Sequence, residues 1–216
     1  MSNSSSALKI GPRIVIALVV AGLSGVIFML TLIEFDHLTS TEEFCTTCHS
    51  MELAAVPYRE SSHYNPASGV RASCGDCHVS EGVLTATFDH VMGTKDLLRQ
   101  IFGPKYDNPV VNLLHLPDAA FAAREWFNDR NSATCMRCHV KEAIIGKRTD
   151  TLKVHQEDAK GKGCVECHIN LVHRKVPGEK TFKRDGWNRM VEEEFNLETG
   201  MAEKILRGDV EAPAVE

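Results

Sequence analysis

CTTCH at residues 45–49, CGDCH at 74–78, CMRCH at 135–139 and CVECH at 164–168 are four copies of one pattern. C-x-x-C-H is the attachment site of a c-type haem, in which two thioethers hold the porphyrin and the histidine ligates the iron from one face. The pattern includes every cysteine of the chain, namely Cys45, Cys48, Cys74, Cys77, Cys135, Cys138, Cys164 and Cys167. The motif histidines are His49, His78, His139 and His168. The sequence therefore predicts four covalently bound haem c groups, with paired CxxC zinc sites as the alternative.

The composition fits a chain that is built around large cofactors. Aromatic residues make up only 6% of the 216 residues, so we expect apolar cofactors to fill much of the interior. Covalent haem attachment takes place on the outer side of the bacterial inner membrane, which predicts a periplasmic location for the main part of the chain. The net charge is −5 and no basic patch is interleaved with aromatic residues, so nucleic-acid binding is not expected.

The N-terminal part contains one segment suited to a membrane. Residues 14–33 carry no charged side chain and lie between Arg13 and Glu34. In a helix, about 20 residues match the thickness of a bilayer core. Lys9 and Arg13 precede the segment, which predicts a cytoplasmic tail over residues 1–13 and a single-pass anchor in the inner membrane. A cleaved signal peptide is the alternative, but it has a shorter apolar stretch and a small-residue cleavage site.

The spacing of the motifs indicates an internal duplication. Cys45 and Cys74 are 29 residues apart, and the first cysteines of the third and fourth motifs are also 29 residues apart. We therefore expect two haem pairs, over residues 45–78 and 135–168. The expected fold is mainly α, with one N-terminal transmembrane helix. A haem-packed periplasmic domain of short helices and long loops follows over residues 34–177.

Three further segments have helical or loop character. Apolar spacing predicts a helix over residues 83–102, ended by Gly103-Pro104. A second helix is expected to open at Pro117, after a loop over residues 106–116. Residues 178–216 form a C-terminal extension, in which apolar residues recur at helical spacing. We expect the extension to dock on the domain's own surface, with a partner-binding arm as the alternative.

Six-coordinate haem needs a second axial ligand, usually a histidine or a methionine. His63, His155 and His173 lie close to motifs in the sequence and are the expected distal ligands. His90 and His115 are further candidates. A surface role is expected for the sixth histidine outside the motifs, His37, which lies beside the membrane segment.

The first motif is followed by an additional candidate ligand. Met51 lies two residues after His49. Both side chains cannot easily ligate the same face of one iron. Met51 therefore either packs against its surroundings, which local geometry favours, or replaces His49 as axial ligand.

Several short stretches together carry a resemblance to a known family. They are CxxCHxM at residues 45–51, His63-Tyr64-Asn65, Ser68 to Ser73, Arg124-Glu125-Trp126, and His173 after the fourth motif. With the N-terminal anchor and the motif spacing, they resemble the NapC/NirT family of membrane-anchored multihaem quinol dehydrogenases. The resemblance covers about residues 10–177. It implies electron transfer from membrane quinol to a periplasmic redox protein or enzyme.

The resemblance also implies roles for particular residues. In the small subunit of cytochrome c nitrite reductase, a relative, the corresponding methionine ligates the first haem, which favours Met51 over His49. Lys95, followed by Asp96, matches a Lys-Asp/Glu pair that some members hold near the quinol site, and the nearby Asp89 is a second candidate carboxylate. The chain departs from the family at Glu81, where some members carry a histidine. Residues 178–216 are also additional.

Two alternative functions stay open from the sequence. The same relay could run in reverse, from a periplasmic dehydrogenase to quinone. A terminal multihaem reductase of a small molecule such as nitrite would instead need an iron without a distal ligand and polar catalytic residues around it. The sequence shows no such polar cluster beyond Lys95 and Asp96. An oligomeric assembly is compatible with all three functions.

Overall fold

The structure, a computed structural model, describes residues 11–146 and 148–215. No strand occurs in these two ranges, so the prediction of a mainly α fold is confirmed. The α-helices are α1 (Pro12–Thr39), α2 (Glu42–Cys45), α3 (His49–Glu60), α4 (Cys74–His78), α5 (Val83–Phe102), α6 (Pro109–Asp129), α7 (Thr151–Gln156), α8 (Arg184–Glu194) and α9 (Met201–Arg207). Short 3-10 helices are η1 (Cys135–Arg137), η2 (Lys141–Ala143), η3 (Cys164–Glu166) and η4 (Glu179–Thr181).

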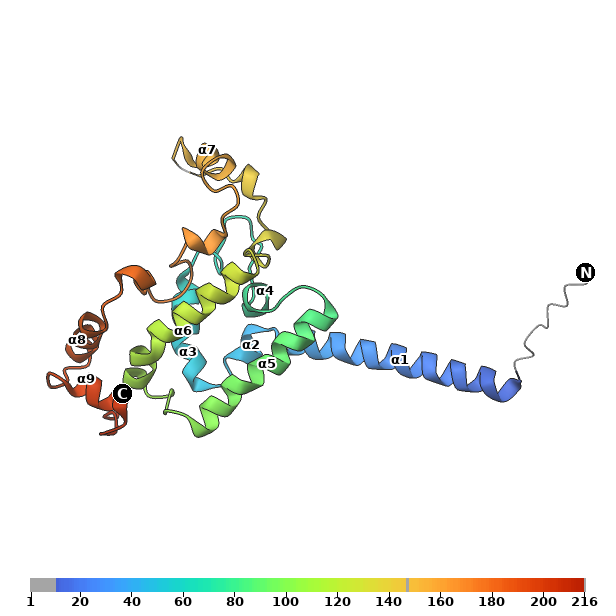
Figure 1. The fold of residues 1–216 in the computed structure, drawn as a ribbon, viewed down its shortest axis with the longest axis horizontal. Helices are drawn as coiled ribbons and strands as arrows, with labels where there is room; N and C mark the ends of the chain where they lie inside the picture. Colours follow the sequence, from blue (N-terminus) through green and yellow to red (C-terminus); the bar gives the residue numbers. More distant parts are fainter. Residues whose placement is uncertain (1–10, 147, 216) are drawn as a thin grey trace, which may run out of the picture.

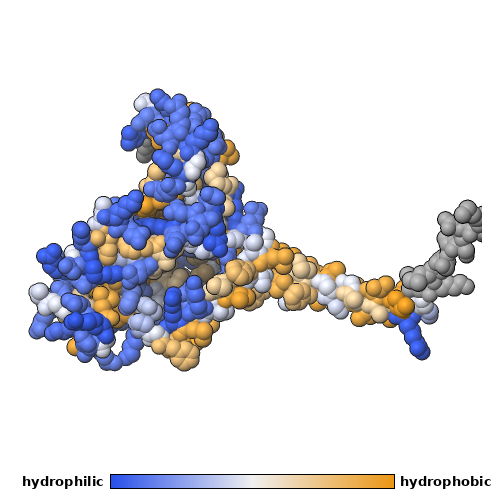
Figure 2. All heavy atoms as spheres, in the orientation of Figure 1, coloured by the Kyte–Doolittle hydropathy of each residue, from blue (hydrophilic) through white to orange (hydrophobic). Residues whose placement is uncertain are grey.

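Helix α1 projects away from the rest of the molecule (Figure 1). Pro12 stands at its first position, where the missing N–H costs no hydrogen bond. The 28 residues include the predicted segment 14–33, whose side chains are mostly exposed and apolar (Figure 2). The helix is therefore long and apolar enough to cross a membrane. Lys9 and most of the predicted tail lie outside the described residues.

Helix α5 packs against the C-terminal end of α1 (Figure 1). Its bounds are those predicted from the sequence. His90 lies at the contact, with Nε2 2.8 Å from the Thr39 hydroxyl and Nδ1 2.8 Å from the Ala86 carbonyl. The ring also makes an edge contact with Phe35 and lies 3.6 Å from an Asp36 oxygen. These contacts join the membrane-length helix to the haem-motif domain.

Helix α6 begins eight residues earlier than predicted, so the loop expected over residues 106–116 is wrong. Asn108 caps the helix by accepting from the N–H groups of Val110 and Val111, and Pro109 occupies the first turn. Pro117 lies inside the helix rather than at its start. Proline cannot donate to the carbonyl four residues earlier, which is that of Leu113. The Trp187 indole N–H donates to this carbonyl at 2.9 Å, so the buried acceptor is satisfied.

The C-terminal extension docks on α6, as the sequence analysis favoured (Figure 1). It forms two helices, α8 and α9, because Asn196 and Gly200 adopt positive φ angles and turn the chain between them. Their apolar residues complete the main protein core of the described chain. This core contains Val110, Val111, Leu113, Leu114, Val176, Trp187, Val191, Ala202 and Ile205.

Candidate haem-binding and quinol-binding sites

Each CxxCH motif forms or borders one short helical turn. In α4, the Ser73 hydroxyl and the Asp76 carboxylate make a capping box that fixes the first turn of the second motif. The third and fourth motifs begin with η1 and η3. Residues three and four apart share one face of such a turn, so both cysteines and the histidine of a motif can contact the same bound group.

Three motif histidines each face one histidine from outside the motifs. His78 faces His173, His139 faces His63, and His168 faces His155. In all three pairs the ring centroids are 6.1 Å apart. The angle between the ring planes varies, from 13° for His155 and His168 to 66° for His63 and His139.

This separation fits a metal ion held between two imidazoles. An imidazole nitrogen ligates a first-row metal ion at about 2 Å, and the ring centre lies ~1 Å behind that nitrogen, so two opposed ligand rings have centres roughly 6 Å apart. With two cysteines beside each of these pairs, the residues present fit haem c.

The electrostatic surroundings favour neutral imidazoles, the form that ligates iron. His78 keeps an exposed surface, yet the protein around its ring lowers its pKa to about 4, and His173 adds to the shift. Burial likewise lowers the pKa of His63 and of His173. His63 Nδ1 is buried without a hydrogen-bond partner. The His173 ring is oriented by a 3.0 Å contact between its Nδ1 and the Ala54 carbonyl.

The first motif lacks a comparable pair. His49 and Met51 both lie in the first turn of α3, and both are exposed. Among the described residues, no second imidazole faces His49. His90 lies at the α1–α5 contact, and His115 lies against Tyr106, at a centroid distance of 5.4 Å. Neither of them faces a motif histidine, so their assignment as iron ligands stays a prediction.

The four motifs lie in contact in their order along the chain. The Cys45 thiol hydrogen-bonds with that of Cys74, which lowers the pKa of Cys45 to about 7. Cys77 of the second motif lies close enough to Cys138 of the third for the two thiols to interact. The first cysteines of the third and fourth motifs, Cys135 and Cys164, are also hydrogen-bonded. This arrangement brings each attachment site next to the following one.

The three candidate residues of the quinol site do not converge. Lys95 is exposed on α5, and Asp96 pairs with Arg99 on the same helix at 3.1 Å. The Asp89 side chain is only 10% exposed, accepts from the Ser80 N–H and lies 3.6 Å from Arg130. Lys95 instead lies on a stripe of exposed apolar residues with helical spacing, formed by Leu84, Phe88, Val91, Leu98 and Phe102.

Two residues that fix the segments near His63 and His173 were not singled out in the sequence for that role. The Tyr58 hydroxyl donates to the Ala72 carbonyl and thereby fixes the segment between His63 and the second motif. Burial, with Cys74 nearby, raises the pKa of Tyr58 to about 12, so the phenol stays protonated. Arg124 contacts the segment that carries His173. Its place in the Arg-Glu-Trp stretch was the only signal for it in the sequence.

Comparisons with known proteins point to a family of c-type cytochromes. The family model for the NapC/NirT cytochrome c family, N-terminal region, matches residues 9–178. TorC of Escherichia coli, a cytochrome c-type protein, is 32% identical over 174 residues, which are 74% of this chain and 43% of TorC. NapC of Escherichia coli is 35% identical over 141 residues, or 62% of this chain and 69% of NapC. A probable tetraheme cytochrome c-type protein of Nitrosomonas europaea is 31% identical over 169 residues, or 74% of this chain and 69% of the relative.

The chain thus spans less than half the length of TorC. No solved structure matches it. The family model covers more than half of the chain and includes all four CxxCH motifs and the membrane-length helix. The chain therefore belongs to the NapC/NirT cytochrome c family.

Proposed function

We propose that this protein is a membrane-anchored tetrahaem cytochrome that carries electrons from membrane quinol to a periplasmic redox partner. The observation that carries the proposal is the set of three opposed histidine pairs, each with a centroid separation of 6.1 Å and each beside a CxxC pair. When bound, haem c supplies one-electron redox chemistry, with a potential set by axial ligands and burial.

Three of the four proposed sites have two histidine ligands. His78 and His173 hold the second haem, His139 and His63 the third, and His168 and His155 the fourth. The neutral state favoured for His78, His63 and His173 supports these roles, because only an unprotonated nitrogen can bind iron.

The first site is proposed to use Met51 as its axial ligand, with His49 as the alternative. Both side chains lie in the first turn of α3 and are accessible. The absence of a facing imidazole among the described residues supports a coordination that differs from the other three sites. Methionine ligation raises the potential of a haem relative to histidine ligation.

The position of the first site relative to α1 supports a role in accepting electrons from the membrane. The first motif begins in α2, directly after α1 ends at Thr39. The Ser40 carbonyl accepts from the Gly75 N–H of the second motif at 3.0 Å, so both motifs lie near the end of the membrane-length helix. The contacts between successive motifs then support a linear relay towards the fourth site. We infer that the N-terminus is cytoplasmic and the motif domain periplasmic.

Lys95 is the proposed electrostatic group of the quinol site. An ammonium group can fix a quinol oxygen and stabilise its negative charge as the proton leaves. The exposed apolar stripe around Lys95 supports the approach of a lipophilic quinol. Asp96 is adjacent and exposed and can accept the proton, whereas Asp89 is held by Ser80 and Arg130.

The experiment mixes the purified full-length protein in lipid vesicles with a naphthoquinol analogue, without oxygen or any other protein. We expect the haem absorbance bands to change to those of the reduced form. Reduction of all haems by dithionite but of none by the quinol would overturn the proposed function while leaving the cytochrome assignment intact.

A further inference from the structure

The segment of residues 169–177 carries His173 and has no regular secondary structure in the described chain. Arg124 of α6 holds both of its ends. The guanidinium donates to the carbonyls of Ile169 at 3.1 Å, Val176 at 2.7 Å and Pro177 at 2.9 Å. Asn170 Oδ1 accepts from Arg124 at 3.3 Å and from the Val176 N–H at 2.9 Å, which closes the segment into a loop.

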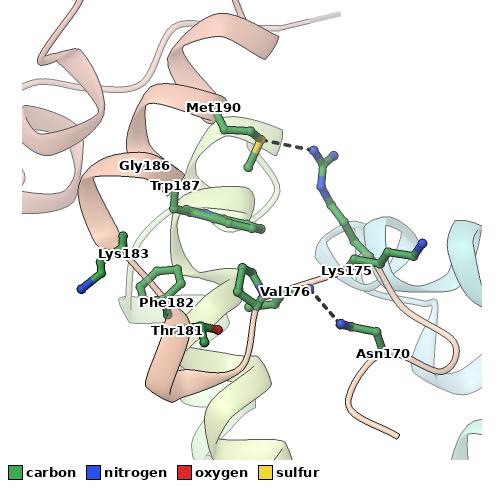
Figure 3. A pocket seen from close by; sticks show the side chains of 11 residues that line it. Asn170, Lys175, Val176, Thr181, Phe182, Lys183, Gly186, Trp187 and Met190 are labelled. Atoms are coloured by element: carbon green, nitrogen blue, oxygen red, sulfur yellow. Dashed lines mark hydrogen bonds between the residues drawn. The ribbon is translucent and has the colours of Figure 1, made fainter.

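The C-terminal extension holds the same loop from the other side. Val176 is 1% exposed and belongs to the same core as Trp187, Val191 and the apolar residues of α6. Figure 3 shows Val176 beside Trp187 and Phe182. Arg174, next to His173, forms a two-point ion pair with Glu194 of α8. The Arg174 guanidinium also contacts the Met190 sulfur at 3.5 Å. The loop is therefore fixed at Arg174 and Val176, within three residues of His173.

The extension lies beyond the region that the family model matches. The family model ends at residue 178, whereas α8 and α9 follow from Arg184 onward. Without Trp187 and its neighbours, Val176 would lose the apolar surface that covers it. Because His173 and His78 come from distant parts of the chain, holding them face to face costs conformational entropy that local contacts must offset.

We propose that the C-terminal extension is a brace for the distal ligand of the second haem: with Arg124, it clamps the loop of residues 169–177 so that His173 stays opposite His78. This inference rests on the proposed ligation of that haem by His173. Arg124, Val176 and the extension are positioning elements, since none of them contacts the iron. The brace keeps the sixth coordination position closed to small molecules and holds the potential of the second haem low.

The test measures the carbon monoxide binding that a variant of the dithionite-reduced full-length protein gains over the parent. Carbon monoxide binds ferrous haem only where an axial position opens, and the first site, which lacks a facing histidine among the described residues, contributes equally in parent and variants. Arg124→Gln removes the donors to three carbonyls and should raise the rate of carbon monoxide binding about tenfold. Val176→Ala removes two buried methyl groups from the loop and should raise it roughly threefold. Val110→Ala makes the same change in the same core but near the start of α6, outside both the loop and the extension, and should bind carbon monoxide at the parent rate.

Redox titration gives an independent readout, in which Arg124→Gln and Val176→Ala should shift one of the haem potentials and Val110→Ala none. Equal effects of Val176→Ala and Val110→Ala would assign the change to general core stability and overturn the brace. A reference variant, His173→Met, separates the two levels of the argument. If it shifts one haem while Arg124→Gln and Val176→Ala behave as the parent, only the brace is wrong. If His173→Met changes no haem spectrum, the ligand assignment is wrong and the brace with it.

Discussion

At the scale of single residues, the histidine pairs differ in how their members are related in the sequence. His155 faces the histidine of the motif that follows it, whereas His63 faces the third motif and His173 faces the second. The spacing of the motifs suggested two equivalent halves, in which His63 would correspond to His155. Instead, His63 and His173 each lie against a motif histidine of the other half. These contacts depend on the tertiary fold, so distance along the chain could not predict them.

Lys95 gives a prediction at the same scale. Replacing Lys95 by Gln removes the ammonium charge but keeps a polar side chain of similar length, so the stripe of apolar residues should stay in place. We expect the rate of haem reduction by a naphthoquinol analogue to fall by a factor of about ten or more, because the developing negative charge on the quinol loses its counter-charge. Dithionite reduction and the haem spectra should not change.

Lys105→Gln is the control for Lys95→Gln. Lys105 is also exposed, lies beyond the end of α5 and pairs with Glu211 on the surface, an interaction of little energetic weight. Its removal should leave quinol-dependent reduction at the parent rate. If Lys95→Gln is reduced by the quinol analogue at the parent rate, Lys95 is an ordinary surface residue.

At the scale of helices, glycine and proline residues mark one helix boundary correctly and another wrongly. The bounds of α5 were predicted correctly because Gly82 and Gly103 flank a regular apolar pattern. The predicted start of α6 is wrong because proline is common at the first position of a helix, whereas Pro117 lies inside this one. The sequence pattern alone could not show that Trp187, from the distant extension, donates a hydrogen bond to the Leu113 carbonyl that Pro117 leaves without a partner.

This contact predicts a coupling between Trp187 and Pro117. Trp187→Phe removes the indole N–H and leaves the buried Leu113 carbonyl without its donor, which should lower the free energy of unfolding by about 1–3 kcal/mol. In a Pro117→Ala background, the new backbone N–H can bond this carbonyl within the helix. The same tryptophan substitution should then cost less, as measured by chemical denaturation of all four proteins in a double-mutant cycle. If Trp187→Phe lowers the free energy of unfolding equally in both backgrounds, the indole hydrogen bond does not replace the missing helix hydrogen bond.

At the scale of the whole molecule, the apolar protein core and the haem motifs occupy different parts of the chain. The cluster between α6 and the extension contains most of the buried apolar residues of the described chain. The remaining domain is organised by the motif turns, the histidine pairs and the contacts between cysteines of successive motifs. Apolar residues at helical spacing predicted helices, and the length of one uncharged apolar segment predicted the membrane-length helix. The position of the extension on α6 needed the tertiary structure.

The proposed function depends most directly on four covalently bound haem c groups. Thioether bonds survive unfolding, so the mass of the denatured full-length protein counts the attached haems directly. After expression with a working haem-attachment system, we predict the mass of the polypeptide plus four haems. In each of four variants, replacing both cysteines of one motif by serine should lower the mass to that of the polypeptide plus three haems. A mass equal to the polypeptide alone, or to the polypeptide plus fewer than four haems, would contradict the account.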